Sequence, residues 1–395
     1  MIYKNNVLGE SISALGFGAM RLPLTAGGKG SDIDQNAFDA MVDYAIAHGL
    51  NYFDTAYPYH DYMSEVAVGN SLSRYDRSSF LLADKFPGHM LRSEYDVDGI
   101  FEKQLRKCQV DYFDFYLLHN VSNGSLYTYL DDNHKIVERV YEFKKQGKIH
   151  HFGMSTHGDV EGLKKFFDKH GDKIEFVQMQ LNYIDWTLQK AEEVYTFLTD
   201  NKIPVWVMEP VRGGKLATLD DYSSNALKEY RKDEKAPGWA FRFLQGLDNV
   251  KVILSGMSDM NQMVDNCETF EERIPATEDE KKILFAYAER LKNSVPCTGC
   301  RYCCEGCPMQ IDIPMLISCY NDSKLYPSVN NSLRLRTIPE GRLPENCIGC
   351  GQCTSVCPQG IDIPDLMIKM TELFSTIPTW EEFSAKRDEM EKQLE

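Results

Sequence analysis

The sequence of 395 residues predicts an α/β protein, in which a (β/α)8 TIM barrel precedes a small, loop-rich α+β domain. Three observations lead to this prediction. Short apolar runs alternate with amphipathic stretches between residues 14 and 273. All of the twelve cysteines except Cys108 and Cys267 lie after residue 296. The length suits one large domain and a smaller one better than a single ordinary domain.

Eight apolar runs have the length and composition of strands that are buried on both faces. The stretches between them have helical periodicity, and several end on Gly or Asn. Eight strand–helix units favour closure into a barrel over an open doubly wound sheet, although an open sheet can use the same elements. The predicted strands span residues 14–20, 51–56, 80–86, 112–119, 150–156, 176–182, 204–209 and 250–256.

Composition and charge limit the class of protein. Hydrophobic residues make up 43% and charged residues 26% of the chain, as in a globular protein. A net charge of −16 argues against non-specific nucleic-acid binding. No apolar run is long enough for a membrane span, and the N-terminus has no secretory pattern. Clustered cysteines without a secretion signal favour metal binding over disulfides, so we expect a reducing cytoplasm.

We expect four segments along the chain. The barrel spans residues 1–273, and a linker helix spans 274–296, where Thr277 and Glu280 have the spacing of a capping box. The cysteine-rich domain spans 297–370, and a helical tail spans 371–395. Large apolar residues are few around the cysteines, so we expect metal to replace much of that domain's core.

The cysteine-rich domain repeats one pattern twice, fifty residues apart: C-x2-C-x2-C-x3-C-P, with an Ile-Asp-Ile-Pro ending. Three thiolates at every third position can hold three corners of one iron–sulfur cube. The pattern resembles that of bacterial two-cluster ferredoxins, in which the fourth cysteine serves the other cluster. This predicts two [4Fe–4S] clusters, one held by Cys297, Cys300, Cys303 and Cys357, the other by Cys347, Cys350, Cys353 and Cys307.

Structural zinc is the alternative for these cysteines, but zinc sites usually show pairs of Cys separated by a longer gap. Cys304 adjoins Cys303 and could compete as a ligand. We interpret it as a buried spectator thiol, because its use would break the match between the two repeats.

Polar residues stand at the carboxyl ends of three successive predicted strands, where barrel enzymes carry their chemistry. They are Asp54 with Tyr59, Lys85 and His119. A phenol is too weak an acid near neutrality. A lysine ammonium beside Tyr59 would strengthen it, Asp54 would keep that ammonium charged, and His119 would orient a substrate oxygen.

The segments "NYFDTAYPY", "LLADKF" and "FDFYLLH" resemble those of the aldo-keto reductases, with all four residues in order. The resemblance covers about residues 7–270. It implies a catalytic tetrad of Asp54, Tyr59, Lys85 and His119. It also implies a nicotinamide cofactor bound without a Gly-x-Gly-x-x-Gly loop, and none is found here.

The resemblance also implies where the cofactor binds. Ser155 and Gln178 would hold the carboxamide, and Met208 would lie against the nicotinamide. Gly256 and Gln262 stand where NADP-specific members often carry cations, which favours NADH over NADPH. Arg212 or Lys215 could still supply charge for a 2′-phosphate, but we expect a surface role for both. The implied cofactor-binding residues are Gly18, Met20, Ser155, Gln178, Met208, Pro210, Val211, Gly256, Gln262 and Asn266.

Together these features predict an NAD(P)H-dependent oxidoreductase that interconverts a carbonyl and an alcohol. Its clusters would connect it to a one-electron carrier such as a ferredoxin or flavodoxin-like protein. A hydride carries two electrons and each cube accepts one, so a bridging flavin would help, although no flavin motif is found. Two alternatives stay open: an ordinary reductase with structural or sensing clusters, and an electron-transfer subunit whose barrel docks a partner. We expect neither nucleic-acid nor membrane binding.

Overall fold

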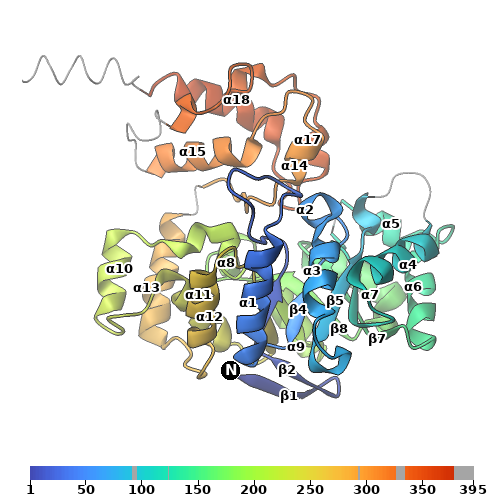
Figure 1. Ribbon diagram of the computed structural model, residues 1–395. Helices are drawn as coiled ribbons and strands as arrows, with labels where there is room; N and C mark the ends of the chain where they lie inside the picture. The colour runs from blue at the N-terminus through green and yellow to red at the C-terminus, as the bar shows by residue number, and fades with distance from the viewer. Residues whose placement is uncertain (91–95, 123, 292–293, 326–333, 378–395) are drawn as a thin grey trace, which may run out of the picture. The chain divides into compact units, whose positions relative to one another are not determined.

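The computed structural model describes the chain except for residues 91–95, 123, 292–293, 326–333 and 378–395 (Figure 1). It divides into two compact units, Met1–Arg290 and Leu291–Glu395. The helix expected as a linker, α13 (Glu278–Arg290), lies within the first unit. The predicted tail falls outside the described residues from 378 onward.

The predicted (β/α)8 barrel is confirmed, because eight parallel strands close in the order β10-β3-β4-β5-β6-β7-β8-β9. Pairing of β10 with β3 joins the last strand to the first, with Ile253 opposite Leu15. The barrel strands are β3 (Leu15–Gly18), β4 (Tyr52–Asp54), β5 (Leu81–Phe86), β6 (Phe113–Leu118), β7 (Ile149–Thr156), β8 (Phe176–Gln180), β9 (Val205–Met208) and β10 (Val250–Ser255).

Helices surround the barrel (Figure 1), and aspartate begins many of them. The Asp34 carboxylate, for example, accepts from the backbone N–H of Ala37, and Asp96, Asp159, Asp220 and Asp259 do the same in later helices. The principal helices of this unit are α1 (Gln35–Ala47), α3 (Ser64–Leu72), α4 (Val97–Cys108), α6 (Ile136–Lys145), α7 (Val160–His170), α9 (Ala191–Asp200), α10 (Asp221–Lys228), α11 (Ala236–Gln245) and α12 (Met260–Thr269).

Aromatic side chains fill the barrel interior, so it is a packed core and not a pore. Tyr52, Phe115, Phe176 and Trp206 are fully buried there in one cluster. The hairpin of β1 (Tyr3–Val7) and β2 (Glu10–Ser13) lies at the foot of the barrel and contributes Ile12 to that cluster (Figure 1). Chemistry is thereby confined to the opposite end.

The helix α13 begins with the predicted capping box. The N–H of Thr277 donates to the Glu280 carboxylate at 2.7 Å, and the N–H of Glu280 donates to the Thr277 hydroxyl at 3.3 Å. Its last residue, Arg290, pairs with Asp220 at 2.8 Å, so α13 packs on α10.

The second unit has a larger apolar core than the sequence suggested. Each Ile-Asp-Ile-Pro ending buries both of its isoleucines and begins a helix, α15 (Ile313–Leu325) or α18 (Ile363–Phe374). These two helices pack together. Cysteines of both repeats belong to this core or pack on it, so the contribution of metal to it stays a prediction. The short elements α14 (Tyr302–Glu305), η5 (Pro344–Asn346) and α17 (Gln352–Ser355) complete the unit.

Candidate active site and cysteine cages

A buried ion pair lies at the carboxyl end of the barrel. Lys85, the fifth residue of β5, has no exposed surface, and its Nζ lies 2.5 Å from Oδ1 of Asp54, the last residue of β4. The same ammonium donates to the carbonyl of Thr55 at 2.7 Å. Burial raises the pKa of Asp54 above its ordinary value, and the Lys85 ammonium opposes that shift. Removing either partner would leave the other charge unpaired in the core, at a cost of about 3–5 kcal/mol.

Tyr59 and His119 complete the predicted group of four. Tyr59 begins α2 (Tyr59–Tyr62), and the Lys85 Nζ lies 5.1 Å from the centre of its ring. His119 follows β6, and its ring centre lies 5.9 Å from that of Tyr59, nearly perpendicular to it. Burial holds the pKa of His119 well below its usual range, so its imidazole is neutral near pH 7. Three strand ends thus bring an ammonium, a phenol and a neutral imidazole together.

Two further histidines lie near His119, and sequence reasoning missed them. The ring of His89, in the turn after β5, is 4.5 Å from that of His119. His157, which follows β7, lies within electrostatic range of both and contacts Gln180 at 2.8 Å. Their positions just after strand ends were the signal that could have found them.

These histidines predict a pH-dependent stability. Burial lowers the pKa of His89 to about 4, and it lowers the pKa values of His119 and His157 as well. Below about pH 6.5 the unfolded chain therefore binds protons that the folded chain does not, so stability falls as the pH falls. We expect His89 alone to cost about 2 kcal/mol between pH 6.5 and 5.

Urea unfolding at several pH values, followed by the tryptophan fluorescence of the barrel, measures this slope. The His89→Phe variant should flatten it. A free energy of unfolding that is constant between pH 7 and 5, or a slope unchanged in His89→Phe, would contradict the prediction.

The residues expected to hold the carboxamide lie on adjacent strands, since Ser155 of β7 is paired with Gln178 of β8. The Ser155 Oγ accepts from the N–H of Asn120 at 2.8 Å. The Gln178 amide nitrogen lies 3.8 Å from the sulfur of Met208, at the end of β9. Among the described residues, the buried Gln178 Oε1 has no hydrogen-bond partner. An orphaned acceptor of this kind fits the NH₂ group of a carboxamide.

The residues expected around the rest of the cofactor lie near the same ends of the strands. Gly256 follows β10 beside the side chain of Arg21, and Asn266 of α12 donates to the Ser255 hydroxyl at 2.8 Å. Gln262 is engaged at the start of α12, where it accepts from the N–H of Ser258 and donates to Asp259, both at 2.9 Å. Gly18 ends β3, Met20 follows it, and Pro210 and Val211 follow β9.

The expectation that Arg212 lies at the surface is wrong. Its side chain is 2% exposed, and its Nε lies 3.1 Å from the buried carboxylate of Asp185. That carboxylate also accepts from Asn182 at 2.6 Å and from Gln180 at 2.7 Å. The network has no local sequence signature, because it joins the loops after β8 and β9.

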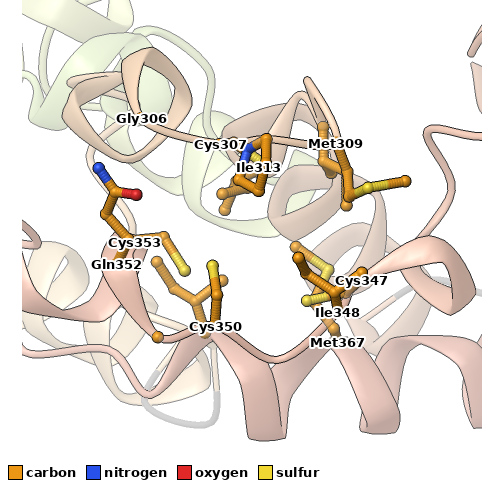
Figure 2. Close-up of a pocket in the computed structure, with 14 residues that line it drawn as sticks. Gly306, Cys307, Met309, Ile313, Cys347, Ile348, Cys350, Gln352, Cys353 and Met367 are labelled. Carbon is orange, nitrogen blue, oxygen red and sulfur yellow. The ribbon is translucent and has the colours of Figure 1, made fainter.

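One cysteine cage surrounds a pocket of ≈ 360 Å³. Cys307 of the first repeat lines it together with Cys347, Cys350 and Cys353 of the second (Figure 2). This arrangement fits the crossed ligand set, in which the fourth cysteine serves the other triplet.

Two members of the other triplet, Cys297 and Cys303, are buried in the apolar core of the second unit, and Cys300 is half-buried. Cys357 packs against this core, as do Cys307, Cys347 and Cys353. Cys304 takes the place that Thr354 has in the second repeat. The N–H of Ile363 donates to the Thr354 hydroxyl at 3.1 Å, whereas the N–H of Ile313 donates to the carbonyl of Ile311 at 3.0 Å. Cys304 is half-buried, so the prediction that its thiol is buried is wrong.

Comparison with known proteins identifies the barrel. A model of the aldo/keto reductase family matches residues 14–283, well over half of the chain. The chain belongs to the aldo/keto reductase family. A second model, of a 4Fe-4S dicluster domain, matches residues 296–361. Both predicted resemblances are confirmed, and this aldo/keto reductase is an oxidoreductase that carries a 4Fe-4S domain.

Relatives of this reductase match mainly its barrel. An uncharacterized oxidoreductase of Bacillus subtilis, YqkF, is 26% identical over 71% of this chain and 94% of its own. An NADPH-dependent alpha-keto amide reductase of Saccharomyces cerevisiae is 29% identical over 50% of this chain and 62% of its own.

Solved structures share the fold. The holo form of aldo-keto reductase AKR11C1 from Bacillus halodurans aligns with a TM-score of 0.56 at 22% identity, over 73% of this chain and 96% of its own. A Klebsiella pneumoniae aldo/keto reductase in complex with NADP and acetate aligns with a TM-score of 0.58 at 19% identity, over 71% of this chain and 94% of its own. Within the described residues, every helix is too short or too polar to cross a lipid bilayer.

Proposed function

We propose that this reductase interconverts a carbonyl and an alcohol with a nicotinamide cofactor, and that Tyr59 is its general acid and base. The observation that carries the proposal is the buried Lys85–Asp54 pair, 2.5 Å apart, beneath the ring of Tyr59 and across from His119. A barrel that served only to dock a partner would gain nothing from a buried charge pair, which is costly to desolvate.

Each of the four residues has a separate proposed role in proton transfer. A bound nicotinamide supplies the hydride, which adds to the carbonyl carbon. The carbonyl oxygen then takes a proton from the Tyr59 hydroxyl, and the resulting phenolate is stabilised by the Lys85 ammonium. Asp54 fixes the ammonium in place. His119, neutral near pH 7, donates a hydrogen bond to the substrate oxygen without competing for the proton.

We propose that Ser155 and Gln178 hold the carboxamide and that the cofactor is NADH. The orphaned Gln178 Oε1 supports the first point. The choice of NADH rests on the start of α12. There the Gln262 side chain already makes hydrogen bonds within the protein, and the Asp259 carboxylate would repel the 2′-phosphate of NADPH. A KM for NADPH below that for NADH would contradict this choice.

We propose that two [4Fe–4S] clusters bind with crossed fourth ligands and exchange electrons with a ferredoxin or flavodoxin-like carrier in the cytoplasm. One-electron transfer is the chemistry that such clusters supply. The shared pocket of Cys307 with the second triplet supports the crossing. Cys297, Cys300, Cys303 and Cys357 would hold the first cluster.

An anaerobic titration with NADH, followed by absorbance and electron paramagnetic resonance, tests whether barrel and clusters form one redox path. We expect reduced-cluster signals to grow with NADH, and carbonyls to be reduced in a parallel assay. Clusters that stay oxidised while carbonyls are reduced would assign them a structural or sensing role. Reduced clusters without any carbonyl turnover would contradict the reductase function.

A further inference from the structure

Three consecutive residues after Tyr59 have left-handed backbone conformations, and none is glycine. The φ angles of His60, Asp61 and Tyr62 are 52°, 52° and 70°. Each costs about 1–2 kcal/mol for an L-residue. Such a run persists only where its surroundings hold it, and it follows directly on the proposed acid.

The holding contacts come from a short hairpin between β3 and α1, formed by residues 22–34 with Leu24 bridged to Ile33. The N–H of Leu22 donates to Nε2 of His60 at 2.9 Å. Nδ1 of His60 lies 2.9 Å from the carbonyl of Gly30, so the neutral imidazole bonds both sides of the 22–34 hairpin.

A second contact holds the next residue of the run. The N–H of Ser31 donates to Oδ2 of Asp61 at 3.1 Å. Gly30 permits this approach, because a Cβ there would lie 1.6 Å from the same carboxylate oxygen. The hairpin therefore holds His60 and Asp61 through hydrogen bonds. A larger side chain at position 30 would collide with the Asp61 carboxylate.

The loop that contains Tyr59 is fixed at both of its ends. Asp54 belongs to β4, and the buried Ser64 begins α3, where its hydroxyl donates to the carbonyl of Ala19 and contacts the Thr55 hydroxyl, both at 2.9 Å. Because these ends are fixed, relaxation of the left-handed run must move the residues between them. Tyr59, the proposed acid, is one of these residues.

We propose that His60 is a positioning residue, which holds the Tyr59 hydroxyl at the proton-transfer position by tying the left-handed run to the 22–34 hairpin. The inference rests on the proposed role of Tyr59 as the acid. The same hairpin joins the cofactor side through its neighbour Arg21. The Arg21 side chain lies beside Gly256, and the Arg21 backbone carbonyl accepts from the Ser258 hydroxyl at 2.9 Å. The hairpin thus links the proposed nucleotide-binding segment to the acid.

The His60→Gly variant tests this role, because glycine adopts the left-handed conformation without cost but lacks both hydrogen bonds. We expect kcat to fall about tenfold or more, with the Kd for NADH within about twofold of wild type. The solvent deuterium isotope effect on kcat should rise as proton transfer becomes slower. Lys202→Gly is the matched control, because Lys202 is also left-handed and is exposed just before β9, at the opposite end of that strand from Met208.

Gly30→Ala perturbs the neighbouring contact between the hairpin and Asp61, and it leaves the sequence around Tyr59 unchanged. We expect it to lower kcat and raise the isotope effect as His60→Gly does, and it carries the test if His60→Gly does not fold. Wild-type kcat and isotope effect in these variants, with Tyr59→Phe inactive, would overturn the positioning role alone. Turnover that persists in Tyr59→Phe would overturn the acid role, and this inference with it.

Discussion

The Tyr59→Phe variant should lose carbonyl reduction, with kcat/KM lower by about a thousandfold or more. The substitution removes one oxygen and keeps the ring, so the contact with His119 and the barrel core stay intact. Without the hydroxyl, the ring beside the Lys85 ammonium has no proton to give to the alkoxide. Anaerobic consumption of NADH with a panel of aldehydes and ketones measures the loss.

Tyr57→Phe is the matched control for this variant. Tyr57 lies two residues earlier in the same loop, and the hydrogen bond that its hydroxyl makes within the described part of the chain is a long one, from Lys103 at 3.4 Å. We expect Tyr57→Phe to turn over at the wild-type rate, and both variants to bind NADH as wild type does. Retained carbonyl reduction in Tyr59→Phe would remove Tyr59 from the acid role.

The Cys307→Ser variant should lose the cluster that is held by the second triplet, although Cys307 belongs to the first repeat. We expect about half of the iron and sulfide of the wild type, because a cube that lacks one thiolate is lost or loses iron. The electron paramagnetic resonance spectrum of the reduced variant should lack the interaction between two clusters. Iron analysis on anaerobically purified protein is the first measurement.

Double variants test the crossing itself. If Cys307 and Cys350 serve one cube, Cys307→Ser with Cys350→Ser should lose no more iron than either single variant, whereas Cys307→Ser with Cys300→Ser should lose both clusters. The opposite pattern would show that each repeat binds its own cube. Cys304→Ser is the control, and we expect its iron content to equal that of the wild type, because Cys304 has no counterpart cysteine in the second repeat, where Thr354 stands.

Local patterns were enough to predict most of the architecture. Each barrel strand is a short apolar run with its own helix. Such a run can be recognised in the sequence without knowledge of its neighbours in space. The positions of Asp54, Lys85 and His119 at strand ends were equally legible, because parallel strands in a barrel bring their carboxyl ends to one face. The cysteine spacing of each repeat is likewise a local property.

Other parts of the site depend on contacts between residues far apart in the chain. The sequence predicts Arg212 at the surface. In the structure it is buried, because the loop after β8 supplies the carboxylate of Asp185 as its partner. In the sequence, His60 is an ordinary polar residue of a loop. In the structure, a hairpin about thirty residues earlier forms hydrogen bonds with both nitrogens of its ring.

The sequence by itself determined the barrel, the two repeated cysteine patterns and the residue types of the proposed tetrad, because these follow from short-range periodicity and spacing. Only the tertiary structure decided which hairpin bonds His60 and Asp61 next to Tyr59, and which histidine lies beside His119. It also decided that Cys307 shares a pocket with the second triplet. The physical reason is that burial and hydrogen bonding of a polar side chain depend on partners that folding brings in from distant segments.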